Sequence, residues 1–224
     1  MRKIFIDGGA NKGQSIKAFL AEWPSASEYE IYSFEASAGA EIRQSLENIR
    51  KKHKNINIIN KALWIEDTFK TFYDDEKTSS SLIKEKPVAY KSSKMVETVN
   101  LSNWIKDNFV YSDEIILKLD VEGAEYEILQ QMMEEGTILM VNVLLAEIHG
   151  SKCGKSIEDS IKLIKNLKSY NHDVYRWEAE DFKYEQYRDL VYSETFLREL
   201  YGNWSNRGYD RVVQMRKLSE VTRK

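Results

Sequence analysis

A glycine-rich stretch near the start of the chain carries the clearest chemical signal. It reads Ile4-Phe5-Ile6-Asp7-Gly8-Gly9-Ala10-Asn11-Lys12-Gly13-Gln14-Ser15. The spacing Asp-x-Gly-x-x-x-Gly follows an apolar run, so the glycines allow a sharp turn close to a ligand just before the free N–H groups of a helix. A dinucleotide fingerprint would need Gly-x-Gly-x-x-Gly. The acid in front favours instead a ligand with an amino-acid moiety, and S-adenosylmethionine is such a ligand.

Glu35 provides the second signal, because it ends a predicted strand 28 residues after Asp7. An acid at this edge of an α/β sheet is where both hydroxyls of a ribose are held. The end of the next predicted strand would then border the adenine. We therefore expect the cofactor to contact Asp7, Gly8, Gly9, Ala10, Asn11, Gly13, Ser15, Glu35, Ala36, Ala62, Leu63 and Asp120.

A third cluster of chemistry-bearing residues lies in Leu117-Lys118-Leu119-Asp120-Val121-Glu122-Gly123-Ala124-Glu125. Here Asp120 ends a predicted strand, and Glu122 opens the next helix, where negative charge is favourable. A sugar hydroxyl is a poor nucleophile at neutral pH, so a methyl acceptor of that kind needs a general base. We expect Asp120 or His149 to be that base, and we expect Lys118 or Glu122 to adjust its basicity.

Glu147-Ile148-His149 ends the following predicted strand, and its outer two side chains share one face because strand side chains alternate. We expect Glu147 to contact the substrate and His149 to lie beside Asp120. As an alternative, Asp120, Glu147 and His149 would hold Mg²⁺ or Mn²⁺, since carboxylates and imidazole suit such ions.

The last third of the chain is rich in aromatic residues, with seven of the 13 tyrosines lying between Tyr170 and Tyr209. Tyrosines with polar rims suit sugars, because they offer apolar ring faces and hydroxyl partners. We predict that residues 178–209 form an insertion or lid over the acceptor. The expected acceptor contacts there are Trp177, Tyr184, Tyr187 and Trp204. The alternative is that these rings pack inside a closing hairpin.

These residues need a scaffold, and strand-like and helix-like segments alternate along most of the chain. The predicted strands cover residues 3–7, 30–34, 56–63, 71–73, 96–101, 114–121, 138–148, 174–177 and 210–215. The predicted helices cover residues 16–23, 42–52, 103–108, 122–133 and 157–167. Such alternation indicates an α/β fold with a mostly parallel sheet and helices on both faces. We find no internal repeat or linker and expect one domain over residues 1–224.

The composition excludes some classes of binding partner and some cellular locations. The 33 Lys and Arg residues against 36 Asp and Glu residues, a net charge of −3, argue against nucleic acid as the partner. The single cysteine excludes an intramolecular disulfide and favours a reducing compartment. No apolar run approaches the length of a signal peptide or membrane span. We expect a cytoplasmic protein, in the host cytoplasm if viral, with no membrane partner; the sequence leaves its oligomeric state open.

In this order, the stretches IDGGANKGQS, SFEAS, NKAL, KLDVEGAEYEIL and AEIH resemble the FkbM family of S-adenosylmethionine-dependent methyltransferases. The resemblance implies a Rossmann-like, seven-stranded sheet with an antiparallel last strand. It implies that Asp7, Gly9 and Gly13 line the methionine moiety and Glu35 the ribose. The chain departs from the family at residues 101–104, which read LSNW where members often carry L-D-D-W/L. It also lacks the usual segment before the first strand, which suggests a domain excised from a longer polypeptide.

The function that the resemblance implies is methyl transfer to a hydroxyl, often on a sugar or glycosylated product. We therefore expect an O-methyltransferase acting on a sugar or glycan, for example a deoxyhexose such as rhamnose. A methyltransferase for a lipid, polyketide or other small metabolite would share every motif. A nucleoside-cap methyltransferase fits the charge less well, and a non-catalytic S-adenosylmethionine-binding module would bind cofactor without turnover.

Overall fold

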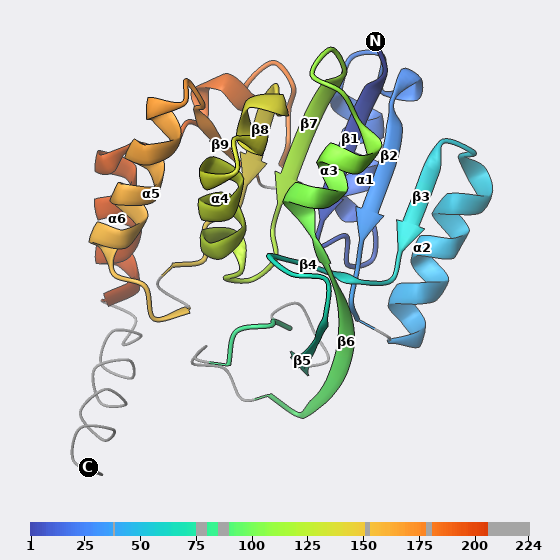
Figure 1. Ribbon diagram of the computed structural model, residues 1–224, viewed down its shortest axis with the longest axis horizontal. Helices are drawn as coiled ribbons and strands as arrows, with labels where there is room; N and C mark the ends of the chain where they lie inside the picture. The colour runs from blue at the N-terminus through green and yellow to red at the C-terminus, as the bar shows by residue number, and fades with distance from the viewer. Residues whose placement is uncertain (38, 75–79, 85–89, 151–152, 178–180, 206–224) are drawn as a thin grey trace.

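A parallel sheet with helices on both faces forms the body of the computed structural model (Figure 1). The structure describes residues 1–37, 39–74, 80–84, 90–150, 153–177 and 181–205. Within that part the central sheet has six strands, all paired in parallel. In sheet order they are β3 (Ile56–Ile59), β2 (Glu30–Phe34), β1 (Lys3–Gly8), β7 (Glu114–Leu119), β8 (Val143–Ala146) and β9 (Val174–Arg176). The strand order reverses between β1 and β7, and open α/β sheets bind ligands at the carboxyl ends beside such a reversal.

The two central strands are apolar on both faces, as expected for strands covered by helices. Ile4, Phe5 and Ile6 of β1 are fully buried. In β7 the run of buried apolar residues is interrupted by Lys118, whose side chain is 1% exposed. A buried ammonium is costly unless it is paired, so this lysine must have partners inside the protein.

Helices cover the sheet on both sides. The helices are α1 (Gln14–Glu22), α2 (Ala40–Lys52), α3 (Leu101–Asn108), α4 (Glu125–Glu134), α5 (Ile157–Ser169) and α6 (Glu194–Ser205). One core cluster packs α3, α4, α5 and α6 against the sheet, and a second packs α1 and α2 against the other face. In the second cluster the ring of Phe19 stacks on Phe5 with centroids 3.9 Å apart. Burying one such side chain stabilises the fold by about 1.5–3 kcal/mol.

A second, three-stranded sheet lies below the carboxyl ends of the central strands (Figure 1). Its order is β4 (Ala62–Trp64), β6 (Ser92–Asn100) and β5 (Phe69–Asp74). The β4–β6 pairing is parallel and the β5–β6 pairing antiparallel. This sheet is built from the stretch of chain where the regular alternation of strands and helices is broken, and it forms a wall beside the site.

Two predicted strands are wrong in extent. The run 56–63 is divided between β3 and β4, because the chain turns at Lys61, whose N–H donates to Ile59 O at 2.9 Å. The run 138–148 begins as a short 3-10 helix, Thr137–Met140, and only Val143–Ala146 is strand. A continuous apolar run does not by itself distinguish a strand from a buried helical turn.

The sheet has six strands in the described part of the chain rather than the expected seven. The predicted antiparallel strand at residues 210–215 lies outside the described residues. At the outer edge of β9, Val191 instead forms an isolated antiparallel bridge with Tyr175. Two further hydrogen bonds, Arg176 N–H to Leu190 O and Tyr192 N–H to Val174 O, extend that antiparallel contact. Among the described helices, none has both the length and the apolar character needed to cross a membrane.

Candidate active site

The glycine-rich loop connects the end of β1 with the start of α1. Gly9 and Gly13 have φ values of 79° and 82°, a region that side chains other than glycine rarely adopt. A Cβ on Gly9 would overlap the carbonyl oxygen of Asp120, and a Cβ on Gly13 would overlap Ile49. Glycine is therefore required at Gly9 by the backbone of Asp120 as well as by its φ, and at Gly13 mainly by its φ.

Lys118 supports the loop from below. Its Nζ donates to the carbonyl oxygens of Gly8 at 3.0 Å and Gly9 at 2.8 Å. The same nitrogen lies 3.1 Å from Asp7 Oδ1 and 3.6 Å from Asp120 Oδ2. Burial lowers the pKa of Lys118, but these two carboxylates outweigh that effect and hold the pKa above its ordinary value. The lysine is therefore a buried cation whose contacts hold the loop in place.

Asp7 lies beneath the loop and not beside the ligand space. It is fully buried, and its Oδ2 accepts hydrogen bonds from Ser15 Oγ at 2.7 Å and Ser33 Oγ at 3.3 Å. This corrects the expectation that the Asp7 side chain lines the cofactor site, because its oxygens face the two serines and Lys118. Its role is to hold the loop, as is that of Ser15.

Glu35 lies at the end of β2, and its carboxylate accepts two backbone hydrogen bonds. One comes from Asn11 N–H at 2.7 Å and the other from Ser37 N–H at 2.6 Å. Burial raises the pKa of Glu35 above its ordinary value, while the two N–H groups oppose that rise. Each carboxylate oxygen has more than one lone pair, so acceptor capacity remains for a ligand hydroxyl.

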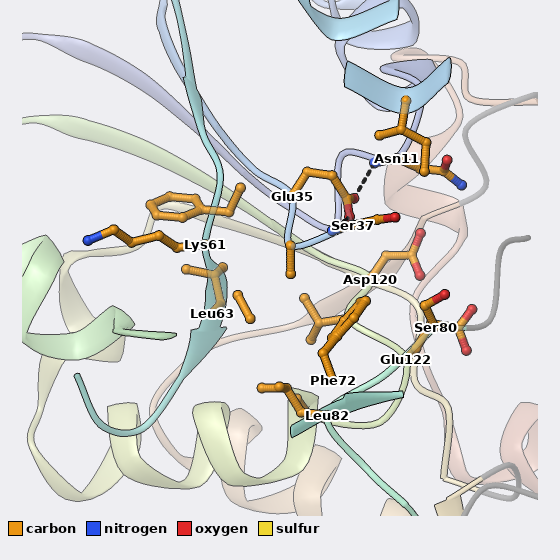
Figure 2. Close-up of a pocket in the computed structure, with 17 residues that line it drawn as sticks. Asn11, Glu35, Ser37, Lys61, Leu63, Phe72, Ser80, Leu82, Asp120 and Glu122 are labelled. Atoms are coloured by element: carbon orange, nitrogen blue, oxygen red, sulfur yellow. Dashed lines mark hydrogen bonds between the residues drawn. The ribbon is translucent and has the colours of Figure 1, made fainter. Parts of the chain in front are cut away.

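A cleft with an empty volume of about 660 Å³ opens beside Glu35 (Figure 2). It is lined by Gly9, Asn11, Phe34, Glu35, Ala36, Ser37, Ile42, Lys61, Ala62, Leu63, Phe72, Ser80, Leu82, Asp120, Val121, Glu122 and Ala124. Of the expected cofactor residues, Gly9, Asn11, Glu35, Ala36, Ala62, Leu63 and Asp120 are in this lining. The expected residues Asp7, Gly8, Ala10, Gly13 and Ser15 are not in it; they belong to the loop that shapes it.

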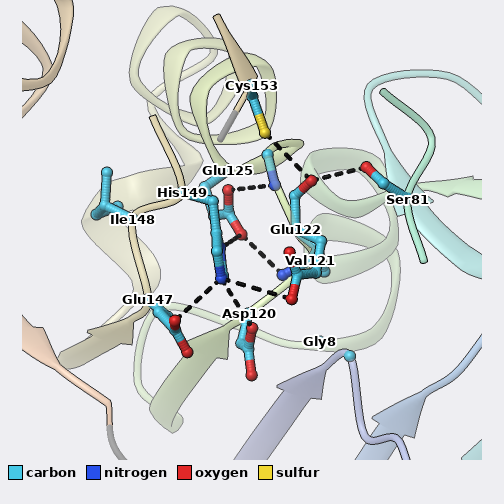
Figure 3. A network of polar contacts seen from close by, with 12 residues as sticks. Gly8, Ser81, Asp120, Val121, Glu122, Glu125, Glu147, Ile148, His149 and Cys153 are labelled. Carbon is cyan, nitrogen blue, oxygen red and sulfur yellow. Dashed lines mark hydrogen bonds and ion pairs between the residues drawn. The ribbon is translucent and has the colours of Figure 1, made fainter. Parts of the chain in front are cut away.

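The far end of the cleft is crowded with carboxylates around His149 (Figure 3). His149 Nε2 lies 3.1 Å from Glu147 Oε1, 3.7 Å from Glu122 Oε1 and 3.8 Å from Asp120 Oδ1. Its Nδ1 lies 3.1 Å from Glu125 Oε1. Burial lowers the pKa of His149, but the carboxylates, Glu125 first, hold it well above its ordinary value. Burial also raises the pKa of Asp120, against the opposing effects of Lys118 and His149.

The carboxylate of Glu122 projects from a turn with a strained backbone. Glu122 has a φ of 56°, and its carbonyl oxygen accepts hydrogen bonds from Ser81 Oγ at 2.7 Å and Cys153 Sγ at 3.4 Å. The helix that Glu122 was expected to open begins three residues later, at Glu125. The buried Glu125 carboxylate accepts from Val121 N–H and Gly123 N–H, both at 2.8 Å. Glu125 thus takes the helix-start role predicted for Glu122 and also holds His149.

The chain matches the family model described as "Methyltransferase FkbM domain" over residues 7–199. The protein belongs to the FkbM methyltransferase family. A solved structure of Methyltransferase FkbM from Methylobacillus flagellatus KT is similar to this chain at 10% sequence identity and a TM-score of 0.40. That similarity covers 80% of this chain and 33% of the other chain. No curated protein sequence matches the chain.

Three of the four aromatic residues expected at the acceptor lie elsewhere in the structure. Trp177 and Tyr187 are 2% and 3% exposed and belong to the core cluster under α1. Tyr184 packs edge-on against Trp23, with ring centroids 4.9 Å apart. Their alternative role as packing residues is therefore the one the structure supports. Trp204 lies within α6, and its side chain is outside the described part.

Several residues that line the cleft could not be predicted from the sequence. The most prominent are Phe72, Ser80 and Leu82, which come from β5 and the segment after it. No local pattern marks them, because they reach the cleft only through the pairing of β5 with β6. Glu125 was also missed as a partner of His149, although an acid at a predicted helix start was the available signal.

The family uses S-adenosylmethionine, and the chemistry of the cleft fits that group. Leu63, Phe72 and Leu82 form an apolar wall suited to a planar base. Glu35 would accept from the ribose hydroxyls. Beside it Asn11 lines the cleft, and its side-chain Oδ1 is buried without a hydrogen bond in the described part of the chain. The lining therefore offers groups of matching polarity to the planar base and to the ribose of the cofactor.

Proposed function

We propose that this methyltransferase transfers a methyl group from S-adenosylmethionine to a hydroxyl of a sugar or glycan, for example a deoxyhexose such as rhamnose. The observation that carries the proposal is that a single cleft is lined by both Glu35 and Asp120. Glu35 suits a ribose, and Asp120 stands beside His149 at 3.8 Å, where a reacting hydroxyl would lose its proton. Methyl transfer to oxygen requires a cofactor site and a general base in the same cleft. We call the part of the cleft around Glu35 its cofactor end and the part around Asp120 its base end, after the general base.

S-adenosylmethionine supplies a methyl group activated by a sulfonium. The acceptor oxygen bonds to the methyl carbon as the carbon–sulfur bond breaks, and the bonding pair stays on sulfur. The proton of the acceptor hydroxyl passes to the protein. This chain must therefore align the reacting oxygen and provide a proton acceptor, which typically contributes on the order of 10²–10⁴-fold to the rate.

Asp120 is the better placed of the two predicted bases. Its side chain is 28% exposed and lines the cleft, whereas the His149 side chain is 1% exposed and lies behind it. His149 and Lys118 then flank Asp120 and hold its carboxylate in place. Glu122, at 3.7 Å from His149, adds to the negative charge around the imidazole.

The polarity of the base end supports a hydroxyl-rich acceptor. Asp120, Glu122 and Ser80 line the cleft there, and Glu147, 46% exposed, stands beside it. Carboxylates accept hydrogen bonds only, so they suit a molecule that offers several hydroxyl donors. The same negative charge disfavours a polyphosphate backbone such as that of a nucleic acid.

The test is to incubate the purified chain with methyl-labelled S-adenosylmethionine and a panel of free sugars, glycosides, hydroxylated lipids and polyketides. We expect a sugar methyl ether and equimolar S-adenosylhomocysteine, both detected by mass spectrometry, and loss of product with Asp120→Asn. Methylation of a lipid or polyketide alone would replace the acceptor class. Cofactor binding in calorimetry without turnover on any acceptor would contradict the proposed activity.

A further inference from the structure

Asp120, Glu122 and His149 each direct one ligand atom to a common point at the base end of the cleft. These three atoms all lie within 4.8 Å of one another. They come from the end of β7, from the strained turn after it and from the segment after β8. We infer that Asp120, Glu122 and His149 form a divalent-cation site that binds the acceptor hydroxyl, an inference that rests on the proposed function for the role of the ion.

The imidazole supplies an observation independent of the acids. His149 is 3% exposed, and its Nε2 points into the group of carboxylates. Although Glu147 Oε1 is 3.1 Å away, Nε2 forms no hydrogen bond of acceptable geometry. A buried polar atom without a hydrogen bond is uncommon in a native protein, and a water or an ion bound to that atom is a recognised explanation.

The second nitrogen of the ring is already fixed. His149 Nδ1 contacts Glu125 Oε1 at 3.1 Å, and Glu125 is held in turn by two backbone N–H groups. A carboxylate on the far nitrogen of a metal-binding histidine fixes the ring and makes the ligating nitrogen more basic. This chain therefore has the outer partner that a histidine ligand needs, as well as the ligand itself.

The excess of negative charge around His149 also favours a bound cation. Four carboxylates lie within 3.8 Å of the His149 ring, those of Asp120, Glu122, Glu125 and Glu147. Lys118 is 3.6 Å from one of them, Asp120. A divalent cation would offset this excess of negative charge, and on binding it would displace any proton from Nε2 into solvent.

The mixed donor set favours Mn²⁺ over Mg²⁺. Imidazole and carboxylate ligands suit first-row transition ions, whereas Mg²⁺ prefers oxygen ligands and retains its water. Glu122 replaces Glu147 as the second acid of the set expected from sequence, because its oxygen and not that of Glu147 belongs to the close group. An acceptor hydroxyl bound to the ion would have a lowered pKa, and Asp120 Oδ2, which faces Lys118, would remain for the proton.

The test uses Mn²⁺ alone, titrated into the chelator-treated full chain and followed by calorimetry and by loss of the free-ion electron paramagnetic resonance signal. We expect a single site, and we expect Glu122→Gln and His149→Gln each to weaken it by about tenfold or more. Glu134→Gln, the same change at an exposed position of α4, is the matched control and should bind Mn²⁺ as the parent does. Melting temperature identifies a variant that has lost its fold; if His149→Gln is one, Glu122→Gln decides the result.

The proposed site would be overturned if the parent chain did not bind Mn²⁺. It would also be overturned if Glu122→Gln left Mn²⁺ binding unchanged. Methyl transfer that a chelator does not reduce would overturn the role of the ion while the proposed function stands. Conversely, Mn²⁺ binding by a chain that binds no S-adenosylmethionine in the same calorimeter would leave the site standing and remove the proposed function.

Discussion

At the end of β2, the carboxylate of Glu35 is held by the backbone N–H groups of Asn11 and Ser37. At the ends of β7 and β8, the carboxylates of Asp120, Glu122 and Glu147 instead face the imidazole of His149. The first arrangement is fixed by the fold of the main chain. The second depends on the charges of neighbouring side chains, and each of those charges depends on the others.

This difference separates the two tasks of the cleft. Backbone donors present a fixed acceptor to a ligand that is the same in every cycle, which is suited to a cofactor. A set of coupled side-chain charges responds to a proton or an ion, which is suited to the chemical step. Substitutions at the two ends should therefore have different effects on cofactor affinity and on rate.

Lys118 is the residue whose loss should affect both ends. Lys118→Met removes the cation beside buried Asp7 and the donor to the carbonyls of Gly8 and Gly9. Leaving a buried carboxylate without its partner costs about 3–5 kcal/mol, so we expect a loss of that size in the free energy of unfolding measured with urea. Lys17→Met, at an exposed position of α1, is the control and should change it by about 0.5 kcal/mol or less. Unchanged stability would mean that the loop does not depend on this cation.

Substitutions at the base end should lower the rate and spare the cofactor. We expect Asp120→Asn to reduce kcat by about 10²–10⁴-fold, because it keeps the size of the side chain and removes its basicity. His149→Gln should reduce kcat by roughly 100-fold, because it removes the group that flanks Asp120. Cofactor affinity from calorimetry should stay close to that of the parent in both variants. Near-normal kcat in both would show that alignment alone, without a base, accounts for catalysis.

The opposite pattern is expected at Glu35. Glu35→Gln keeps the shape of the side chain but removes its charge, and lost hydrogen bonds to a charged group cost about 1.5–3 kcal/mol. The affinity for S-adenosylmethionine should fall accordingly, with kcat at saturating cofactor little changed. Glu41→Gln, on the exposed first turn of α2, serves as the control. Equal losses of affinity and kcat would mean that the two ends do not act separately.

A smaller effect should appear in the pH dependence of stability. Burial raises the pKa of Glu35 in the folded protein above its ordinary value of 4.5. The folded state therefore binds this proton more tightly than the unfolded state, and the resulting stability is present below pH 4.5 and lost as the pH rises through the folded pKa. Relative to Glu35→Gln, the parent should thus become less stable as the pH rises through that range in denaturant titrations. A constant difference would show that the Glu35 pKa is the same in both states.

Much of the cofactor end was predictable, because its signals are local. Asp7, the glycines after it and Glu35 lie at strand ends within one short stretch, and parallel strands bring their carboxyl ends to one edge. The sequence did not separate residues that shape the loop, such as Asp7 and Ser15, from those that line the cleft, such as Asn11. That distinction depends on which way each side chain points once Lys118 is buried beneath the loop.

Only part of the base end was predicted, and the structural cause that brings its residues together differs from the predicted one. Glu147 and His149 were expected to meet through strand alternation, yet β8 ends at Ala146 and they meet in the segment beyond it. The partnership of His149 with Glu125 required knowledge of where α4 begins. The role of the aromatic segment could not be predicted, because large rings suit both sugar sites and cores, and only the packing against Trp23 distinguishes the two.

The three-stranded sheet forms one wall of the cleft separately from the central sheet. Residues 62–100 supply one wall through Leu63, Phe72 and Leu82, yet every pairing in that sheet is made within the same stretch of chain. Insertion, deletion or recombination in this stretch would change this wall of the cleft without removing a backbone partner of β1, β2 or β7. Relatives that differ in this stretch would keep the strand ends beside Glu35 and Asp120 and would differ in the wall that faces the planar base.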